Sequence, residues 1–112
     1  MKRSYELYKF DRDDLGGHIT LYVDDDSLMI EDYTIGSTCE AFFGTDEREY
    51  RVSVDRAGAV SILGHYGLTA ANGPVEALGR WLGATLTGCS KAATRFEEIA
   101  GDAGVSVDKF VW

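Results

Sequence analysis

The sequence predicts an α+β fold, an antiparallel sheet of about five strands with three helices packed on one face, in the order β-β-β-β-α-α-α-β. Three observations support this fold class. Apolar and polar residues alternate in the first half of the chain, with the period of half-buried strands. Apolar residues recur three and four positions apart in the second half, as they do in amphipathic helices. The last residues, 105–112, alternate again and predict a closing strand.

Three strands with short polar connections are expected first. The alternating runs cover residues 4–10, 18–24 and 27–33. The first connection, residues 11–17, ends on two glycines, and the second is the acidic turn Asp24–Asp26. Alternation places Tyr8 and Tyr22 on the outer face of the sheet, away from the core. Because the connections are short, we expect the three strands to form an antiparallel meander.

The segment 42–56 is expected to hold a fourth, central strand. Three of its residues face one way and three the other, namely Tyr50, Val52 and Val54 against Glu49, Arg51 and Ser53. Ahead of this strand, residues 37–44 are compatible with a single helical turn capped by Ser37 or Thr38. The helices that follow are expected to pack on one face of this strand.

Each of the three helices has an expected start and an apolar stripe. The capping or first-turn residues are Asp55, Pro74 and Ser90. The stripes are Ala59, Val60, Ile62 and Leu63 in the first helix, Val75, Leu78, Leu82 and Leu86 in the second, and Ala92, Ala93, Phe96, Ile99 and Ala100 in the third. Gly101 and Gly104 are expected to loosen the end of the third helix.

Length and composition favour one globular domain over residues 1–112. The chain has 112 residues, of which 45 % are hydrophobic, which suits a folded domain with one core. No apolar run is long enough to span a membrane, and the basic N-terminus lacks the apolar segment of a signal peptide. We therefore expect a cytoplasmic protein. Cys39 and Cys89, 50 positions apart, are expected to be free, mostly buried thiols.

The net charge of −8 is carried almost entirely by the first half of the chain. Residues 1–56 hold 14 acidic and 7 basic side chains, whereas residues 57–112 hold 5 and 4. An acidic surface can serve solubility alone, or it can recognise a basic partner. Direct binding to nucleic acid is disfavoured, because lysines and arginines do not cluster in this sequence.

Exposed tyrosines among carboxylates are typical of protein-binding surfaces, since tyrosine gives a large contact area at low entropic cost. The alternative is that these tyrosines stabilise the sheet by cross-strand pairing. If the surface binds a partner, the expected contact residues are Tyr8, Asp13, Asp14, Tyr22, Asp24, Asp25, Asp26, Glu31 and Asp32.

No motif in the sequence indicates catalysis, and no catalytic residue, metal ligand or cofactor is expected. The acidic turn lacks the glycine and the twelfth-position glutamate of an EF-hand loop. His18 and His65 are the only histidines, and they are too far apart in the chain to form a metal-binding motif. A small metal-dependent or hydrolytic enzyme that uses Asp and His side chains remains an alternative.

Some residues of this chain resemble a family of small bacterial immunity proteins that accompany polymorphic or contact-dependent growth-inhibition toxins. The matching residues are Phe42, Phe43, Gly44, Asp46, Glu49, Tyr50, Val52, Val54, Phe110, Val111 and Trp112. The resemblance implies that the protein neutralises a cognate toxin by stoichiometric binding, as a monomer or homodimer. A basic nuclease domain is the toxin that an acidic surface would suit. A homo-oligomeric adaptor joined through an edge strand is a further alternative.

Overall fold

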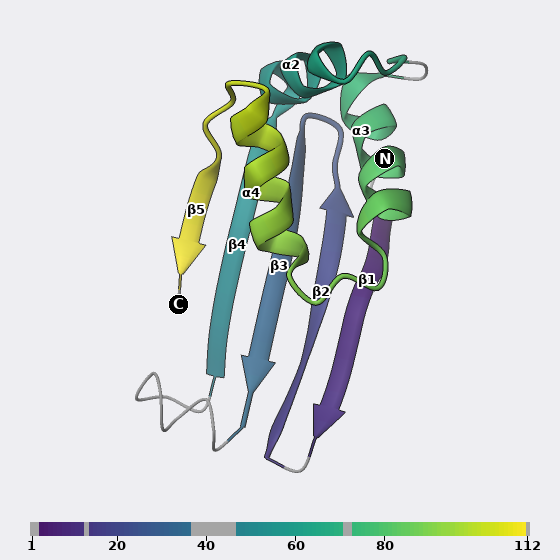
Figure 1. Cartoon of the computed structure of the whole chain (residues 1–112). Helices are drawn as coiled ribbons and strands as arrows, with labels where there is room; N and C mark the ends of the chain where they lie inside the picture. The colour runs from purple at the N-terminus through teal and green to yellow at the C-terminus, as the bar shows by residue number, and fades with distance from the viewer. Residues whose placement is uncertain (1–2, 13, 37–46, 71–72, 112) are drawn as a thin grey trace.

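The computed structural model describes residues 3–12, 14–36, 47–70 and 73–111, and within them it confirms the predicted α+β fold. Five antiparallel strands lie in the order β1-β2-β3-β4-β5, so each strand pairs with its neighbour in the chain. The elements are β1 (Arg3–Arg12), β2 (Leu15–Val23), β3 (Ser27–Ile35), β4 (Glu47–Asp55), α2 (Arg56–His65), α3 (Pro74–Leu86), α4 (Ala92–Asp102) and β5 (Asp108–Val111). Figure 1 shows these three helices on one face, over the half of the sheet nearer the β2–β3 turn.

Several sequence predictions fall outside the described residues. These are the helical turn at 37–44, the contact residue Asp13, the thiol of Cys39 and the terminal Trp112. The other cysteine, Cys89, is a free, half-buried thiol that packs against the core rather than within it.

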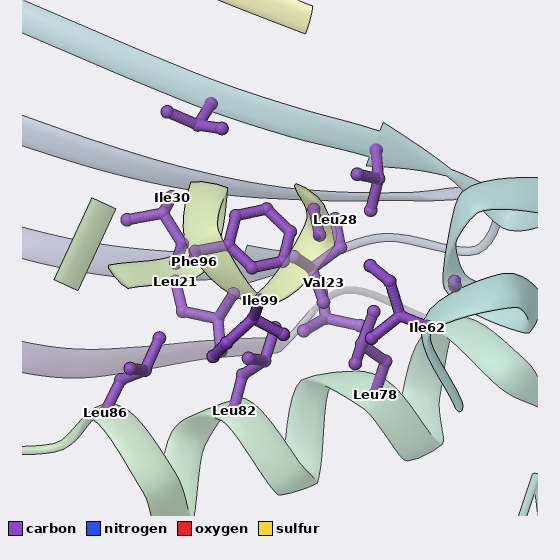
Figure 2. Packing of buried hydrophobic residues seen from close by; sticks show 14 of the residues in the cluster. Leu21, Val23, Leu28, Ile30, Ile62, Leu78, Leu82, Leu86, Phe96 and Ile99 are labelled. Carbon is purple, nitrogen blue, oxygen red and sulfur yellow. The ribbon is translucent and has the colours of Figure 1, made fainter. Parts of the chain in front are cut away.

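The core lies between the sheet and the helices, and the predicted apolar faces build most of it. Leu21 of β2 and Ile30 of β3 point inward and have no exposed surface. Figure 2 shows that α3 directs Leu78, Leu82 and Leu86 toward these strands, while Phe96 of α4 lies over them. Burying each such side chain contributes about 1.5–3 kcal/mol to folding. One predicted core residue is wrong: Val60 of α2 is 53 % exposed, because it lies on the solvent side of that helix.

Two glycines let α3 approach the sheet closely. A Cβ atom on Gly79 would lie 2.5 Å from Cγ2 of Val23, and a Cβ on Gly83 would lie 3.0 Å from the ring of Tyr5. Glycine costs about 1 kcal/mol relative to alanine inside a helix, so its presence here needs a packing reason. That reason is the contact with β1 and β2, which no larger residue would allow without movement of the sheet.

The strands extend further than alternation predicted at the β1–β2 hairpin. β1 continues to Arg12 and β2 begins at Leu15, so Gly16 and Gly17 belong to a strand and not to the turn. A Cβ on Gly17 would collide with the carbonyl oxygen of Tyr33 and would lie 2.9 Å from the ring of Phe10. The glycine therefore serves a close approach between neighbouring strands, which a reading of local turn preference does not detect.

A β-bulge in β1 overturns the predicted orientation of Tyr8. The register with β2 shifts between Glu6 and Tyr8, so that Leu7 is an extra residue in β1. Tyr8 consequently pairs with the buried Ile19 and packs against the core on the helix side of the sheet. The carbonyl oxygen of Leu7 accepts a hydrogen bond of 2.6 Å from the backbone N–H of Gly88, so the α3–α4 connection covers this edge of the sheet.

The helix ends agree only in part with the predictions. Asp55 caps α2 as expected, since its Oδ1 accepts a hydrogen bond of 2.9 Å from the Gly58 N–H. Ser90 is not the cap of α4, which begins one residue later, after Lys91, with no side-chain cap. Gly104, with φ of +74°, ends α4 in a Schellman motif, because the Val105 N–H donates to the carbonyl of Ala100.

The closing strand is shorter than predicted. β5 covers only Asp108–Val111, whereas residues 105–107 precede it without regular pairing, and Val105 and Val107 pack against the core. Val111, the last described residue, is 60 % exposed.

Candidate functional site: the open face of the sheet

The face of the sheet opposite the helices has none of the described helices over it (Figure 1). The strand residues that alternate with the core point toward it, and we call it the open face. Its charged members are Glu6, Lys9, Asp11, Glu31, Glu47, Glu49, Arg51 and Asp108, and its aromatic members are His18, Tyr22, Tyr33 and Phe110. Asp55 ends β4 in the same alternation, but its side chain is engaged in capping α2 and is not counted with this face. All five strands contribute to it, so the site depends on the register of the whole sheet.

The open face is acidic. It carries six carboxylates and two basic side chains, a net charge of −4 with histidine neutral, which is half of the charge of the whole chain. Concentrating charge of one sign on one surface attracts a partner of the opposite sign and raises the rate of encounter.

The centre of the open face is a cluster of charged side chains from three adjacent strands. Arg51 donates from Nε to Oε1 of Glu49 at 2.6 Å, and its Nε lies 3.6 Å from Oε2 of Glu31. The other oxygen of Glu31, Oε1, is 3.6 Å from Nε2 of His18. The side chains of Glu31 and Glu49 are only 16 % and 13 % exposed, whereas those of His18 and Arg51 are 41 % and 42 % exposed. The two carboxyl groups are therefore better screened from water than the two basic side chains beside them.

The pKa values of the two central carboxyl groups are shifted in opposite directions. Burial raises the pKa of Glu31, and the neighbouring Glu49 adds to this, which together outweigh the attraction of Arg51 and His18. The pKa of Glu49 is lowered by its hydrogen bonds with Glu31 and Arg51. Glu31 therefore holds a proton more readily than an isolated glutamate does, and Glu49 holds one less readily.

Aromatic rings flank this cluster on both sides. The ring of Tyr33 stacks on His18 with a centroid separation of 5.3 Å. On the other side, the guanidinium of Arg51 lies 5.5 Å from the ring centroid of Phe110 in a cation–π contact. Phe110 is 50 % exposed and Tyr22 is 39 % exposed, so the open face offers apolar area as well as charge.

The structure describes eight of the nine predicted contact residues, all but Asp13, and it does not bring these eight together. Tyr22 and Glu31 lie on the open face, whereas Tyr8 and Asp32 lie on the helix side. Asp32 is half-buried, and burial raises its pKa. Asp14 and the acidic turn 24–26 sit at opposite ends of β2, which puts them roughly 30 Å apart at about 3.3 Å per residue.

One arginine of this chain, Arg56, already pairs with part of the acidic turn. Arg56 Nη2 lies 2.9 Å from Oδ1 of Asp26 and donates to the carbonyl oxygen of Asp25 at 3.2 Å. Asp24, Asp25 and Arg56 also line a pocket of about 430 Å³, together with Arg3 and Arg80. The turn is thus less acidic than its sequence suggests, which argues against it as the main contact for a basic partner.

Sequence reasoning missed most of the residues of the open face. The sequence pointed most clearly to Glu49 and Arg51, because they alternate with Tyr50 and Val52 and so form the polar side of the predicted fourth strand. Glu6 and Asp11 of β1 and Asp108 of β5 gave no signal of their own, because only the register of the whole sheet places them on the same face, at its two edges.

The two histidines that the enzyme alternative would use lie in different layers of the fold. His18 lies on the open face, while His65 ends α2 in the helix layer and packs edge-on against Tyr66, with a centroid separation of 4.8 Å. Among residues 3–12, 14–36, 47–70 and 73–111, no group of three or more His, Cys, Asp or Glu side chains is placed to hold a metal ion.

Comparison of the chain with family models, with curated proteins and with solved structures found no match. None of the helices in the described ranges is both long and apolar enough to cross a membrane. The fold and the open face together define a small α+β protein with one acidic, aromatic surface on its sheet.

Proposed function

We propose that this chain is an immunity protein, which neutralises a cognate bacterial toxin by binding it one to one. The observation that carries the proposal is the open face, which combines a net charge of −4 with partly exposed aromatic rings on a rigid sheet. A rigid surface of this kind loses little conformational entropy when a partner docks. The resemblance of residues such as Glu49, Tyr50 and Phe110 to immunity proteins suggests the role.

The charge of the open face indicates the chemistry of the partner. A toxin domain with a basic surface, such as a nuclease that binds phosphates, complements six carboxylates. Docking of the open face over that basic surface would exclude the nucleic acid substrate from it. Cytoplasmic action on a toxin that has entered the cell is part of this proposal.

Isothermal titration calorimetry with the C-terminal domain of the protein encoded directly upstream tests the proposal. We expect one-to-one binding that weakens about tenfold or more as salt is raised from 50 to 500 mM, because the contact is electrostatic. We also expect co-expression of this chain to restore growth of cells that express the toxin domain. Absence of both binding and protection would contradict the proposed function.

A further inference from the structure

The two outer edges of the sheet differ in whether their backbone groups are used. At the edge formed by β1, a bulge interrupts the strand at Leu7, and the Leu7 carbonyl accepts a hydrogen bond from the N–H of Gly88. At the other edge, β5 pairs with β4 alone, and Figure 1 shows it as the outermost strand. Within the described residues, no backbone hydrogen bond joins β5 to a segment other than β4. An edge of this kind is a template for a further strand.

The side chains of β5 do not protect this edge against strand addition. Proteins often discourage such pairing with a lysine on the edge strand. Here Nζ of Lys109 lies 2.9 Å from Oε1 of Glu97 on α4, so the lysine is directed toward the helix layer. The two residues that follow are apolar and exposed, Phe110 by 50 % on the open face and Val111 by 60 % on the helix side. A strand added at β5 would cover both of them.

A hollow beside β5 provides room for the side chains of an added strand on the helix side. Its volume is about 320 Å³, and it is lined by Glu97, Val105, Ser106, Val107 and Lys109. The carboxylate of Glu97 is already engaged, because it accepts a hydrogen bond of 2.6 Å from the Tyr50 hydroxyl and pairs with Lys109. Since this carboxylate is partnered and two of the lining residues are valines, the hollow suits an aliphatic side chain better than a charged one.

The open face favours positive charge on the other side of an added strand. Successive side chains of a strand point to alternate faces, so every second residue of that strand would extend the open face. The open face has a net charge of −4, and Asp108 of β5 is an exposed carboxylate at its edge. A second copy of this chain is a poorer occupant, because each copy has a net charge of −8 and would bring its own acidic face alongside.

We propose that β5 accepts an extended segment of a basic protein partner as a sixth strand of the sheet. The segment would alternate aliphatic side chains, directed toward the hollow beside α4, with lysines or arginines that extend over the open face. Backbone pairing would supply affinity, and the two sets of side chains would supply specificity. The inference deepens the proposed function, on which it rests for the identity of the partner, but strand addition can be tested without the toxin.

The test uses a defined peptide, Lys-Val-Lys-Val-Lys-Val-Lys with blocked ends, and the full-length protein labelled with nitrogen-15 for NMR. Chemical-shift changes locate the peptide, and hydrogen exchange measures the protection of the β5 amides with and without it. A peptide of the same composition, with its lysines first and its valines last, is the control for charge alone. Val111→Lys places a charge on the edge, and Val60→Lys is the matched control, because it makes the same change at a similarly exposed position on α2. Light scattering of the free protein reports whether a second copy occupies the edge.

We expect the alternating peptide to shift residues 105–111 and to slow hydrogen exchange about tenfold or more at the β5 amides that do not pair with β4. Val111→Lys should weaken binding about fivefold, whereas Val60→Lys should change it less than about twofold. Shifts confined to the centre of the open face, unchanged exchange of the β5 amides, equal binding of the two peptides, equal effects of the two variants, or a dimer that Val111→Lys dissociates would overturn the inference. If the alternating peptide adds to β5 while the upstream-encoded domain does not bind, the proposed function fails and the strand-addition site stands.

Discussion

Substitution of Gly79 by alanine tests the closest contact between the helices and the sheet. The new Cβ would lie 2.5 Å from Cγ2 and 3.3 Å from Cγ1 of Val23, well inside van der Waals contact. Val23 is 2 % exposed and β-branched, so its side chain has few other rotamers available. Either α3 must move outward or β2 must move, and both movements disturb the packing of Leu78 and Leu82.

The loss of stability expected for Gly79→Ala is the difference between two opposing effects. Overpacking a core position costs typically about 2–3 kcal/mol when neighbouring side chains cannot rearrange. Replacing glycine by alanine inside a helix recovers about 1 kcal/mol. We therefore expect Gly79→Ala to lower the free energy of unfolding by about 1–2 kcal/mol, which corresponds to a decrease in Tm of roughly 3–10 °C for a domain of this size.

Gly64→Ala is the matched control, because it makes the same chemical change in α2, where no atom lies within 4 Å of the new Cβ. It should stabilise the protein by up to about 1 kcal/mol. Urea unfolding followed by circular dichroism measures both variants. If Gly79→Ala were as stable as Gly64→Ala, the close approach of α3 to Val23 would not exist and the packing described for the core would be wrong.

Three further predictions concern stability and are checked by urea unfolding. The hydroxyl of Tyr50 donates a hydrogen bond of 2.6 Å to Glu97, and burial together with that carboxylate raises the pKa of Tyr50 to about 12. The unfolded state therefore loses the phenolic proton at a lower pH than the folded state does, and the free energy of unfolding should fall between pH 10 and 12. Tyr50→Phe should lower the free energy of unfolding by about 1 kcal/mol at pH 7 and should abolish the loss of stability between pH 10 and 12. If that alkaline loss persists in the variant, another group causes it. Asp55→Ala removes the cap of α2 and should cost about 1 kcal/mol, whereas Asp55→Asn should cost much less, and equal losses would contradict the capping role. Gly104→Ala, just beyond the end of α4, should cost about 1–2 kcal/mol because φ is +74°. Gly101→Ala, inside α4 with open space around its Cβ, should not destabilise. A neutral Gly104→Ala would rule out the strain.

The elements were predictable where the evidence for them is local. Alternation located the first four strands, and the stripe of Ala92, Phe96 and Ile99 identified α4, because each pattern belongs to one element alone. The bulge at Leu7 was not predictable, since two adjacent residues on one side of a strand break the period without any special residue type. Gly17 was wrongly predicted to lie in a turn for a related reason: it allows a close approach to Phe10 of the neighbouring strand, and local sequence does not show that contact.

The candidate site was less predictable than the fold. Runs of aspartate in turns attract attention in a sequence, yet the turn 24–26 is partly neutralised by Arg56, which lies 30 positions further along the chain. Glu31 and Glu49 meet only because β3 and β4 pair in a particular register, and the long connection between these strands does not fix that register. Counting charges along the sequence therefore identified the acidic first half of the chain, but it could not identify the open face of the sheet as the acidic surface.

The most direct test of the open face as the docking surface compares two charge-reversed variants by calorimetry against the upstream-encoded domain. One variant carries Glu6→Lys, Asp11→Lys and Asp108→Lys, which lie at exposed positions of the open face. The other carries lysine at each position of the turn 24–26, and so changes the net charge of the chain by the same amount. We expect the first variant to bind about tenfold or more weakly than the second. Equal weakening, or a larger loss in the turn variant, would contradict the assignment of the open face as the docking surface.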